Sequence, residues 1–273
     1  MKIFLNFPLL LMVVVCTFHL SCNKTGDDFI SKKIGDSTFD KLADEYVAGY
    51  LKWRPQSGVG LGLHEYDGKL TDFSSGSITI ELARIKKYKK DLMALDTTAL
   101  SSKAFYDYKI LLNAINKDIF DFEVVNSYKN NPMSYAGVFD VNIYIKRNFA
   151  PLKDRVRSII SILNEAPKVY TDAKKNLADS LPEPYIKTAI LIAKGTADFL
   201  GKDLLIALED IKNDSLMKEF GPVNKKAIEE INSYAMYLEK EKLPKANKNF
   251  PLGRENYKKM LSGEMVYLEP EKI

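Results

Sequence analysis

Imidazole groups are scarce in this sequence of 273 residues, which contains only two histidines, His19 and His64. A zinc-peptidase helix of the H-E-x-x-H type needs two imidazoles four residues apart, with a glutamate beside the metal as general base. A Ser-His-Asp triad would have to use one of these two histidines, and no G-x-S-x-G turn is present to expose a serine nucleophile. The residue types and their spacing alone therefore do not indicate a hydrolytic reaction.

His64 precedes the polar stretch Glu65-Tyr66-Asp67. His64 could contact a ligand in a pocket or act as a general base. The alternative is a hydrogen-bonded histidine with a structural role. We favour the structural interpretation, because the sequence shows no catalytic partner for it. Carboxylate-only sites stay open, since 36 acidic residues allow some pair to converge. No spacing singles out one pair.

Residues 1–21 have the organisation of a bacterial export signal. Lys2 supplies a positive charge, and the run Leu9–Phe18 is apolar except for one threonine. This run is too short to span a membrane but has the length of a signal-peptide core. It ends in a triplet, Leu20-Ser21-Cys22, that resembles a lipobox, and the chain then turns polar. We predict cleavage before Cys22 and lipidation of its thiol. Ordinary secretion with a coincidental cysteine is the alternative.

Lipidation at Cys22 would anchor the protein to the bacterial cell envelope, on its periplasmic or surface side. His19 and Cys16 would leave with the signal, and the Cys22 sulfur would be held in a thioether. The mature chain would then contain one imidazole and no thiol. That excludes an intramolecular disulfide, a cysteine nucleophile and a thiolate metal site.

Two further motifs favour structural interpretations. The glycine-rich run Gly58–Gly62 lacks the register of a dinucleotide or phosphate loop and follows Trp53-Arg54-Pro55 instead of a strand, so it is interpreted as a turn. The lysines of Lys86–Lys90 would spread around the outer face of a helix, as a solvated surface. The net charge of +4 is too balanced to predict nucleic-acid binding.

Apolar residues recur at steps of three and four along most of the chain, which predicts an all-α fold, a bundle-like array of many helices. We expect one helical domain over residues 37–273, preceded by a polar tether at 22–36. Ser37 and Asp40 resemble a capping box at the start of the first helix, and Ser101 or Ser102 should cap a later one.

The secondary structure of two further stretches is predicted separately. Near residues 138–147, Val141, Ile143 and Ile145 alternate with polar residues, which fits either a short strand or a helical turn. The longest helical pattern runs from Ile186 to Ile211. Gly195 lies inside that pattern, and we interpret it as a close crossing of two helices, because glycine disfavours a helix interior.

Several segments, in order along the chain, resemble the bacterial DUF885 family from about residue 37 to the C-terminus. The first is Tyr50-Leu-Lys-Trp-Arg-Pro55, continued through Gly60-Leu-Gly-Leu-His-Glu-Tyr-Asp-Gly-Lys-Leu-Thr-Asp-Phe-Ser74. The later segments are Asn131-Pro132 with Tyr135, Arg147-Asn-Phe-Ala-Pro151, Arg155 to Arg157, Asn164-Glu-Ala-Pro167, Asn176-Leu177, Ala189, Gly195 to Leu200, and Leu252-Gly253 with Tyr257 and Leu261.

The resemblance implies a secreted or lipid-anchored, largely helical protein similar to zinc metallopeptidases. In that family the H-E-x-x-H-type helix lies in the C-terminal half, and no position of this sequence matches the zinc ligands or the catalytic glutamate. We therefore expect a truncated or split member that is incomplete at the C-terminus and not a peptidase by itself. Zinc is expected only if the missing C-terminal half is supplied.

Three functions remain open on this resemblance. The chain could be an inactive wall of a peptide-binding cleft, a stand-alone envelope lipoprotein that binds peptides or a partner, or one half of a split metallopeptidase. The candidate pocket residues are His64, Tyr66 and Arg147. A half-protein should also expose an apolar patch larger than the few hundred Å² usual for monomers.

Overall fold

The computed structural model describes residues 24–211, 214–266 and 269, and the predicted signal peptide and lipidation site at Cys22 lie outside them. Every regular element of the described part is helical, which confirms the all-α prediction. The α-helices are α1 Lys24–Trp53, α2 Pro55–Gly60, α3 Ser75–Met93, α4 Ser102–Phe120, α5 Ser127–Asn130, α6 Met133–Ala136, α7 Asn142–Lys146, α8 Leu152–Asn164, α9 Ala166–Asn176, α10 Glu183–Gly201, α11 Asp203–Ala207, α12 Asp214–Tyr237 and α13 Arg254–Gly263.

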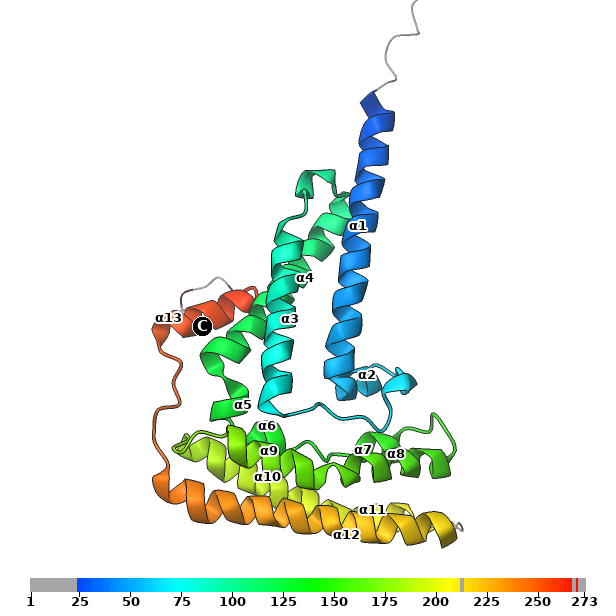
Figure 1. Ribbon diagram of the computed structural model, residues 1–273, viewed down its shortest axis with the longest axis vertical. Coiled ribbons are helices and arrows are strands. Elements are labelled where there is room, and N and C mark those ends of the chain that lie inside the picture. Colours follow the sequence, from blue (N-terminus) through cyan, green and yellow to red (C-terminus); the bar gives the residue numbers. More distant parts are fainter. Residues whose placement is uncertain (1–23, 212–213, 267–268, 270–273) are drawn as a thin grey trace, which may run out of the picture.

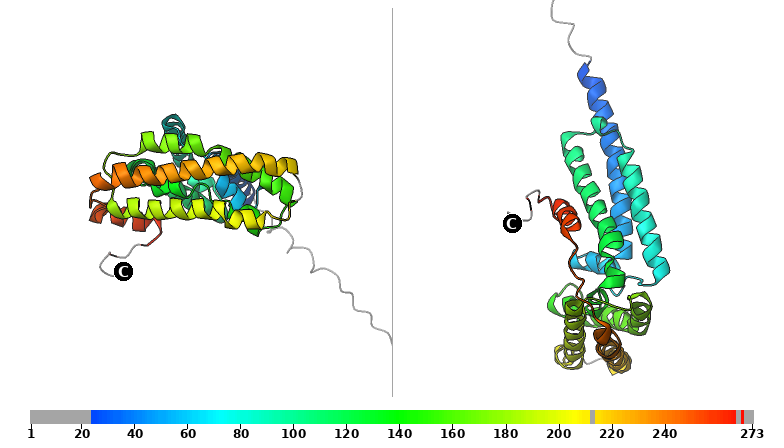
Figure 2. Two further views of the ribbon diagram at one scale, coloured as in Figure 1. Left: turned by 90° about the horizontal axis from the view of Figure 1, so that it is seen from below. Right: turned by 90° about the vertical axis from the view of Figure 1, so that its left-hand side faces the viewer.

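The helices form two layers with separate cores (Figures 1 and 2). Helices α1, α3 and α4 stand upright, and α6 to α12 lie across their lower end. The upper core contains Phe39, Tyr46, Ile85, Leu92, Leu100, Ala104, Ile115 and Phe122. The lower core is larger and is centred on α8, α9, α10 and α12, with Tyr135, Phe139, Ile159, Leu163, Tyr170, Ile186 and Tyr234 among its fully buried side chains.

Serine caps and early prolines set several helix starts. Ser74 and Ser101 accept hydrogen bonds from the backbone N–H groups of Ser77 and Ala104, which would otherwise have no partner in the first turn. Ser101 is therefore the cap of α4, one of the two residues that the sequence suggested. Pro167 lies in the first turn of α9, where its missing N–H costs nothing.

The first helix starts well before its predicted cap. Because α1 begins at Lys24, Ser37 and Asp40 lie inside it, and the capping-box prediction is wrong. Tertiary packing provides the reason. Asp36 of α1 accepts a hydrogen bond from the Ser101 backbone N–H at 2.7 Å, and Gly35 lies directly against the Ala99 backbone. These contacts hold residues 35–36, the end of the segment predicted as a polar tether, against residues 99–101.

The longest predicted helix is interrupted at Lys202, whose φ of −129° and ψ of −74° lie outside the helical region. Asn224 of α12 donates to the Leu200 carbonyl at 3.0 Å and so satisfies one of the last acceptors of α10. The close crossing expected at Gly195 is wrong, because a Cβ there would meet nothing within 4 Å. Other glycines do lie in close contact with distant segments, among them Gly35 beside the Ala99 backbone.

The stretch near 138–147 contains the short helix α7, so the strand alternative is wrong and the helical turn is correct. Asp140 accepts a hydrogen bond from the Asn142 backbone N–H at 3.0 Å and so stabilises its start. Val141 and Tyr144, three residues apart, are buried, as expected for one face of a helix. Within the described residues, no helix is both long and apolar enough to cross a bilayer.

Candidate functional site

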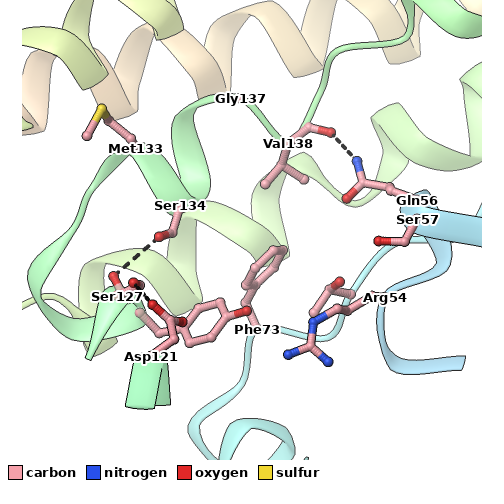
Figure 3. A pocket seen from close by; sticks show the side chains of 12 residues that line it. Arg54, Gln56, Ser57, Phe73, Asp121, Ser127, Met133, Ser134, Gly137 and Val138 are labelled. Atoms are coloured by element: carbon pink, nitrogen blue, oxygen red, sulfur yellow. Dashed lines mark hydrogen bonds between the residues drawn. The ribbon is translucent and has the colours of Figure 1, made fainter. Parts of the chain in front are cut away.

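A cavity of about 480 Å³ lies where the lower ends of the upright helices meet the lower layer (Figure 3). Residues from α2, the loop before α3, the turn that follows α4, α5 and α6 line it, so it depends on both layers. The lining residues are Arg54, Gln56, Ser57, Thr71, Phe73, Asp121, Ser127, Tyr128, Met133, Ser134, Gly137 and Val138. Its volume is typical of sites for small ligands.

Arg54 closes one side of the cavity and is held by two carboxylates. Its Nη1 donates to Oε1 of Glu81 at 3.1 Å, and its Nη2 lies 3.4 Å from Oδ1 of Asp118. Arg84 donates to the same Glu81 from Nε at 2.7 Å and from Nη2 at 2.9 Å. Glu81 is only 2% exposed, so this buried carboxylate is compensated by two guanidinium groups.

Aromatic rings surround this charge network. The Arg54 guanidinium lies 4.5 Å from the ring centroid of Tyr50 and 4.8 Å from that of Trp53. The Trp53 indole N–H donates to the Ser77 hydroxyl at 2.9 Å, and its ring packs edge-on against Tyr128. These contacts fix the position of the arginine by cation–π attraction as well as by ion pairing.

Asp118 also accepts a hydrogen bond from the Tyr46 hydroxyl at 3.1 Å. Burial raises the pKa of the Asp118 carboxyl, while Arg54 and the Tyr46 hydroxyl oppose the change. Burial and the neighbouring Asp118 raise the pKa of Tyr46 well above its ordinary value. The network therefore keeps Tyr46 protonated as a donor and ties α1 to α4.

Asp121 lies on the opposite side of the cavity, at the start of a π-helix, Asp121–Val125, that continues α4. Its Oδ1 accepts a hydrogen bond from the Ser127 hydroxyl, and Ser134 donates to the Ser127 carbonyl at 3.3 Å (Figure 3). The chain then turns at Asn126 in the left-handed conformation, with φ of 51°. Widened helical turns of this kind occur often at functional sites.

Aromatic side chains form the cavity floor. Phe73 and Tyr128 have ring centroids 6.1 Å apart, and Phe73 packs edge-on against Tyr135. The Tyr135 hydroxyl donates to the Tyr128 carbonyl at 2.6 Å and accepts a hydrogen bond from Asn176. Burial raises the pKa of Tyr128, so its phenol stays protonated. The cavity combines charge, hydroxyl groups and aromatic faces.

The three pocket residues suggested by the sequence lie elsewhere, and none lines this cavity. His64 is partly exposed, pairs with Asp67 at 3.0 Å and stacks on Phe149 at 4.0 Å between ring centroids. Arg147 is exposed and donates to the Gly60 carbonyl at 3.3 Å. Tyr66 packs against Gly58, which leaves no room there for a Cβ. These contacts hold α2, and the turn at Leu61 and Gly62 after it, against the segment after α7. The glycine-rich run predicted as a turn is therefore helical up to Gly60.

The described residues also offer no fit for a zinc ion. They contain no group of three or more His, Cys, Asp or Glu side chains placed to hold a metal. His64, the one histidine among them, is occupied by Asp67 and Phe149. The positions of Cys22 and His19 lie outside the described part of the chain.

A second hollow, of about 700 Å³, runs between α1 and α4 and is mainly apolar. The helices run in the same direction here, with α3 antiparallel to them (Figure 1). Four large apolar side chains on its walls are exposed: Val47, Leu61, Ile110 and Met265. We call this hollow the α1/α4 groove. The apolar patch larger than a few hundred Å² that a half-protein should expose stays a prediction.

The family model described as "Bacterial protein of unknown function (DUF885)" matches residues 55–273. The chain belongs to the DUF885 family. The match begins next to Arg54 and includes the other residues that line the cavity.

A solved structure from Shewanella oneidensis, described as "a putative lipoprotein of unknown function", shares the fold of this DUF885 chain. The two superpose with a TM-score of 0.67 at 24% identity, over 74% of this chain and 37% of the other. The present chain therefore spans little more than a third of that protein's length. No protein with a curated description matches the sequence.

Sequence reasoning missed the cavity residues of this DUF885 chain. Arg54 stood within the segment that carried the resemblance but was not singled out. Asp118 and Asp121 are three residues apart, a spacing that places two side chains on neighbouring parts of a helix face. That spacing is common among the 36 acidic residues, so it gave no signal on its own.

Proposed function

We propose that this DUF885 chain is a lipid-anchored protein of the bacterial cell envelope that binds peptides without cleaving them by itself. The cavity between the two layers carries this proposal. Peptides present amide groups, apolar side chains and charged ends, and the cavity offers hydroxyl groups, aromatic rings and a carboxylate. Family resemblance supports peptides as the ligand class, and the lipobox-like triplet at Cys22 supports the anchor.

Catalysis would require groups that the described residues do not bring together. The zinc chemistry implied by the family resemblance does not fit their donor set, so no hydrolytic step is assigned to them. The role of Arg54 is structural in this proposal, because Glu81 and Asp118 hold its guanidinium on the cavity wall. The chain then contributes recognition surface to a peptide site.

The fluorescence of Trp53 provides a readout of peptide binding. Trp53 is the single tryptophan of the chain, and its ring packs against Tyr128 of the cavity. Short peptides should change its fluorescence saturably, and Ser134→Phe, which would fill the cavity without adding a second indole, should abolish the change while the circular dichroism stays helical. Absence of saturable binding by any peptide would contradict the proposal, as would stoichiometric zinc together with chelator-sensitive hydrolysis.

A second candidate function is a role as one part of a two-chain metallopeptidase. The α1/α4 groove favours it, because a separate polypeptide could cover Val47, Leu61 and Ile110 there. Co-purification of a second polypeptide, lost in the groove variant Ile110→Glu, would distinguish it from a stand-alone binding protein.

A further inference from the structure

The charges around the cavity do not cancel. Arg54 and Arg84 are matched by Glu81 and Asp118, with which they form the ion-pair and hydrogen-bond network described above. Asp121 adds a further carboxylate on the cavity wall. Among the described residues, no lysine, arginine or histidine forms an ion pair with it. The site therefore retains one negative charge that a bound cation would neutralise.

One oxygen of the Asp121 carboxylate can accept a hydrogen bond from a ligand. Its Oδ1 accepts the Ser127 hydroxyl, and no described residue donates to its Oδ2. Figure 3 shows Asp121 beside Ser127 and Ser134 at the edge of the cavity, across from Arg54. A ligand ammonium group could donate to Oδ2 without displacing any contact now present.

The remaining walls suit an ammonium group attached to an apolar chain. Phe73 and Tyr128 line the cavity, and aromatic rings attract cations. The hydroxyl oxygens of Ser57 and Thr71 can accept hydrogen bonds from N–H groups. Met133 and Val138 add apolar surface next to them. A ligand carboxylate would meet only Arg54, whose positive charge Glu81 and Asp118 already balance.

We propose that the cavity recognises the free α-ammonium group at the N-terminus of a peptide, through the Asp121 carboxylate. This inference rests on the proposed peptide-binding function and specifies which end of the peptide enters. The ammonium would donate to Oδ2 of Asp121, and the first side chain would lie against Phe73 and Tyr128. Peptides with a blocked N-terminus would lose the charged contact and leave Asp121 desolvated without a partner.

The test compares three forms of one short peptide whose first residue is leucine: unmodified, N-acetylated and C-amidated. Binding to the mature chain is followed by Trp53 fluorescence. N-acetylation should weaken binding about tenfold or more, because a hydrogen bond to a charged group is lost, whereas C-amidation should change it little. Asp121→Asn should weaken binding of the unmodified peptide by a similar factor and should abolish the preference for a free N-terminus.

Two controls separate recognition from folding. Asp198→Asn removes the same charge from an exposed site on α10 and should keep both the affinity and the preference. Ser127→Ala removes the hydrogen bond to Asp121 but keeps its charge, so the preference should survive even if the affinity falls. Equal binding of unmodified and acetylated peptides would overturn this inference alone. Failure of all three peptides to bind would overturn the proposed function itself.

Discussion

Arg54 and Glu81 form an ion pair, with 3.1 Å between Nη1 and Oε1, that joins the end of α1 to α3 beneath the upper core. The carboxylate is almost completely buried, and Arg84 shares it. Removing one partner of a buried ion pair leaves an uncompensated charge away from water, which costs more than the pair contributes to stability when intact. The junction between α1 and α3 therefore depends on this carboxylate.

We expect Glu81→Gln to lower the free energy of unfolding by about 3 kcal/mol, the low end for such a change because glutamine keeps a carbonyl acceptor. Urea denaturation monitored by circular dichroism measures it. Asp91→Asn, which removes an acidic partner from an exposed lysine on the same helix, serves as the control and should change stability little. Equal effects of the two substitutions would show that the Glu81 network does not stabilise the junction.

Two glycines on different helices should respond in opposite ways to the same substitution. A Cβ on Gly35 would overlap the Ala99 carbonyl, whereas one on Gly195 would meet nothing within 4 Å. Gly35→Ala should therefore destabilise the fold by about 1–3 kcal/mol, as overpacking does. Gly195→Ala should stabilise it by about 0.5–1 kcal/mol through helix propensity. The midpoints of urea unfolding measure both, and stabilisation by Gly35→Ala would contradict the packing of α1 against residues 97–99.

This pair of glycines also shows what the sequence could predict. The three-to-four spacing of apolar residues was enough to predict an all-α fold, because that spacing reflects local geometry. The serine side chains suggested Ser101 or Ser102 as a cap, while the alternation at Val141, Ile143 and Ile145 left a short strand and a helical turn open. Close contacts between helices depend on which distant segments meet, and the sequence pattern does not contain that information. Gly195 was therefore selected in place of Gly35.

The cavity was missed for the same reason. Arg54 and Glu81 are 27 residues apart, and nothing in the sequence distinguishes Glu81 from the other carboxylates. Asp121 owes its position to the π-helical turn at the end of α4, which the apolar spacing does not predict. His64 was named as a candidate pocket residue because histidine is rare in this chain. The structure gives it contacts with Asp67 and Phe149 that hold a turn.

Tyr135 should make the stability of the protein depend on pH in the alkaline range. Burial raises its pKa from 10.0 to about 12. Between these values the unfolded chain has lost the phenolic proton and the folded chain still holds it, so the free energy of unfolding falls as pH rises. The full contribution of this group, about 2–3 kcal/mol, is present below pH 10 and is lost as pH rises through about 12.

The substitution Tyr135→Phe isolates that contribution. Below pH 10 it should cost about 1 kcal/mol, because the Tyr128 carbonyl and Asn176 lose a partner. Above pH 10 the difference from the unchanged protein should shrink, since phenylalanine has no proton to lose. Urea unfolding on both sides of pH 10 measures it, with the exposed Tyr106→Phe as control. A difference that stays constant with pH would contradict the raised pKa.

Cys22 should decide where the protein resides in the cell. Its replacement by alanine would remove the thiol that lipidation requires, while the apolar run Leu9–Phe18 would still direct export. Two or more acyl chains bind a membrane stably, whereas a chain without them has no such anchor. We expect Cys22→Ala to move the protein from the membrane fraction to the soluble fraction outside the cytoplasm. Cys16→Ala lies within the predicted signal and should leave the distribution unchanged. Intact-mass measurement should find diacylglycerol on the unchanged chain and none on Cys22→Ala, and membrane retention of both variants would show that the anchor lies elsewhere.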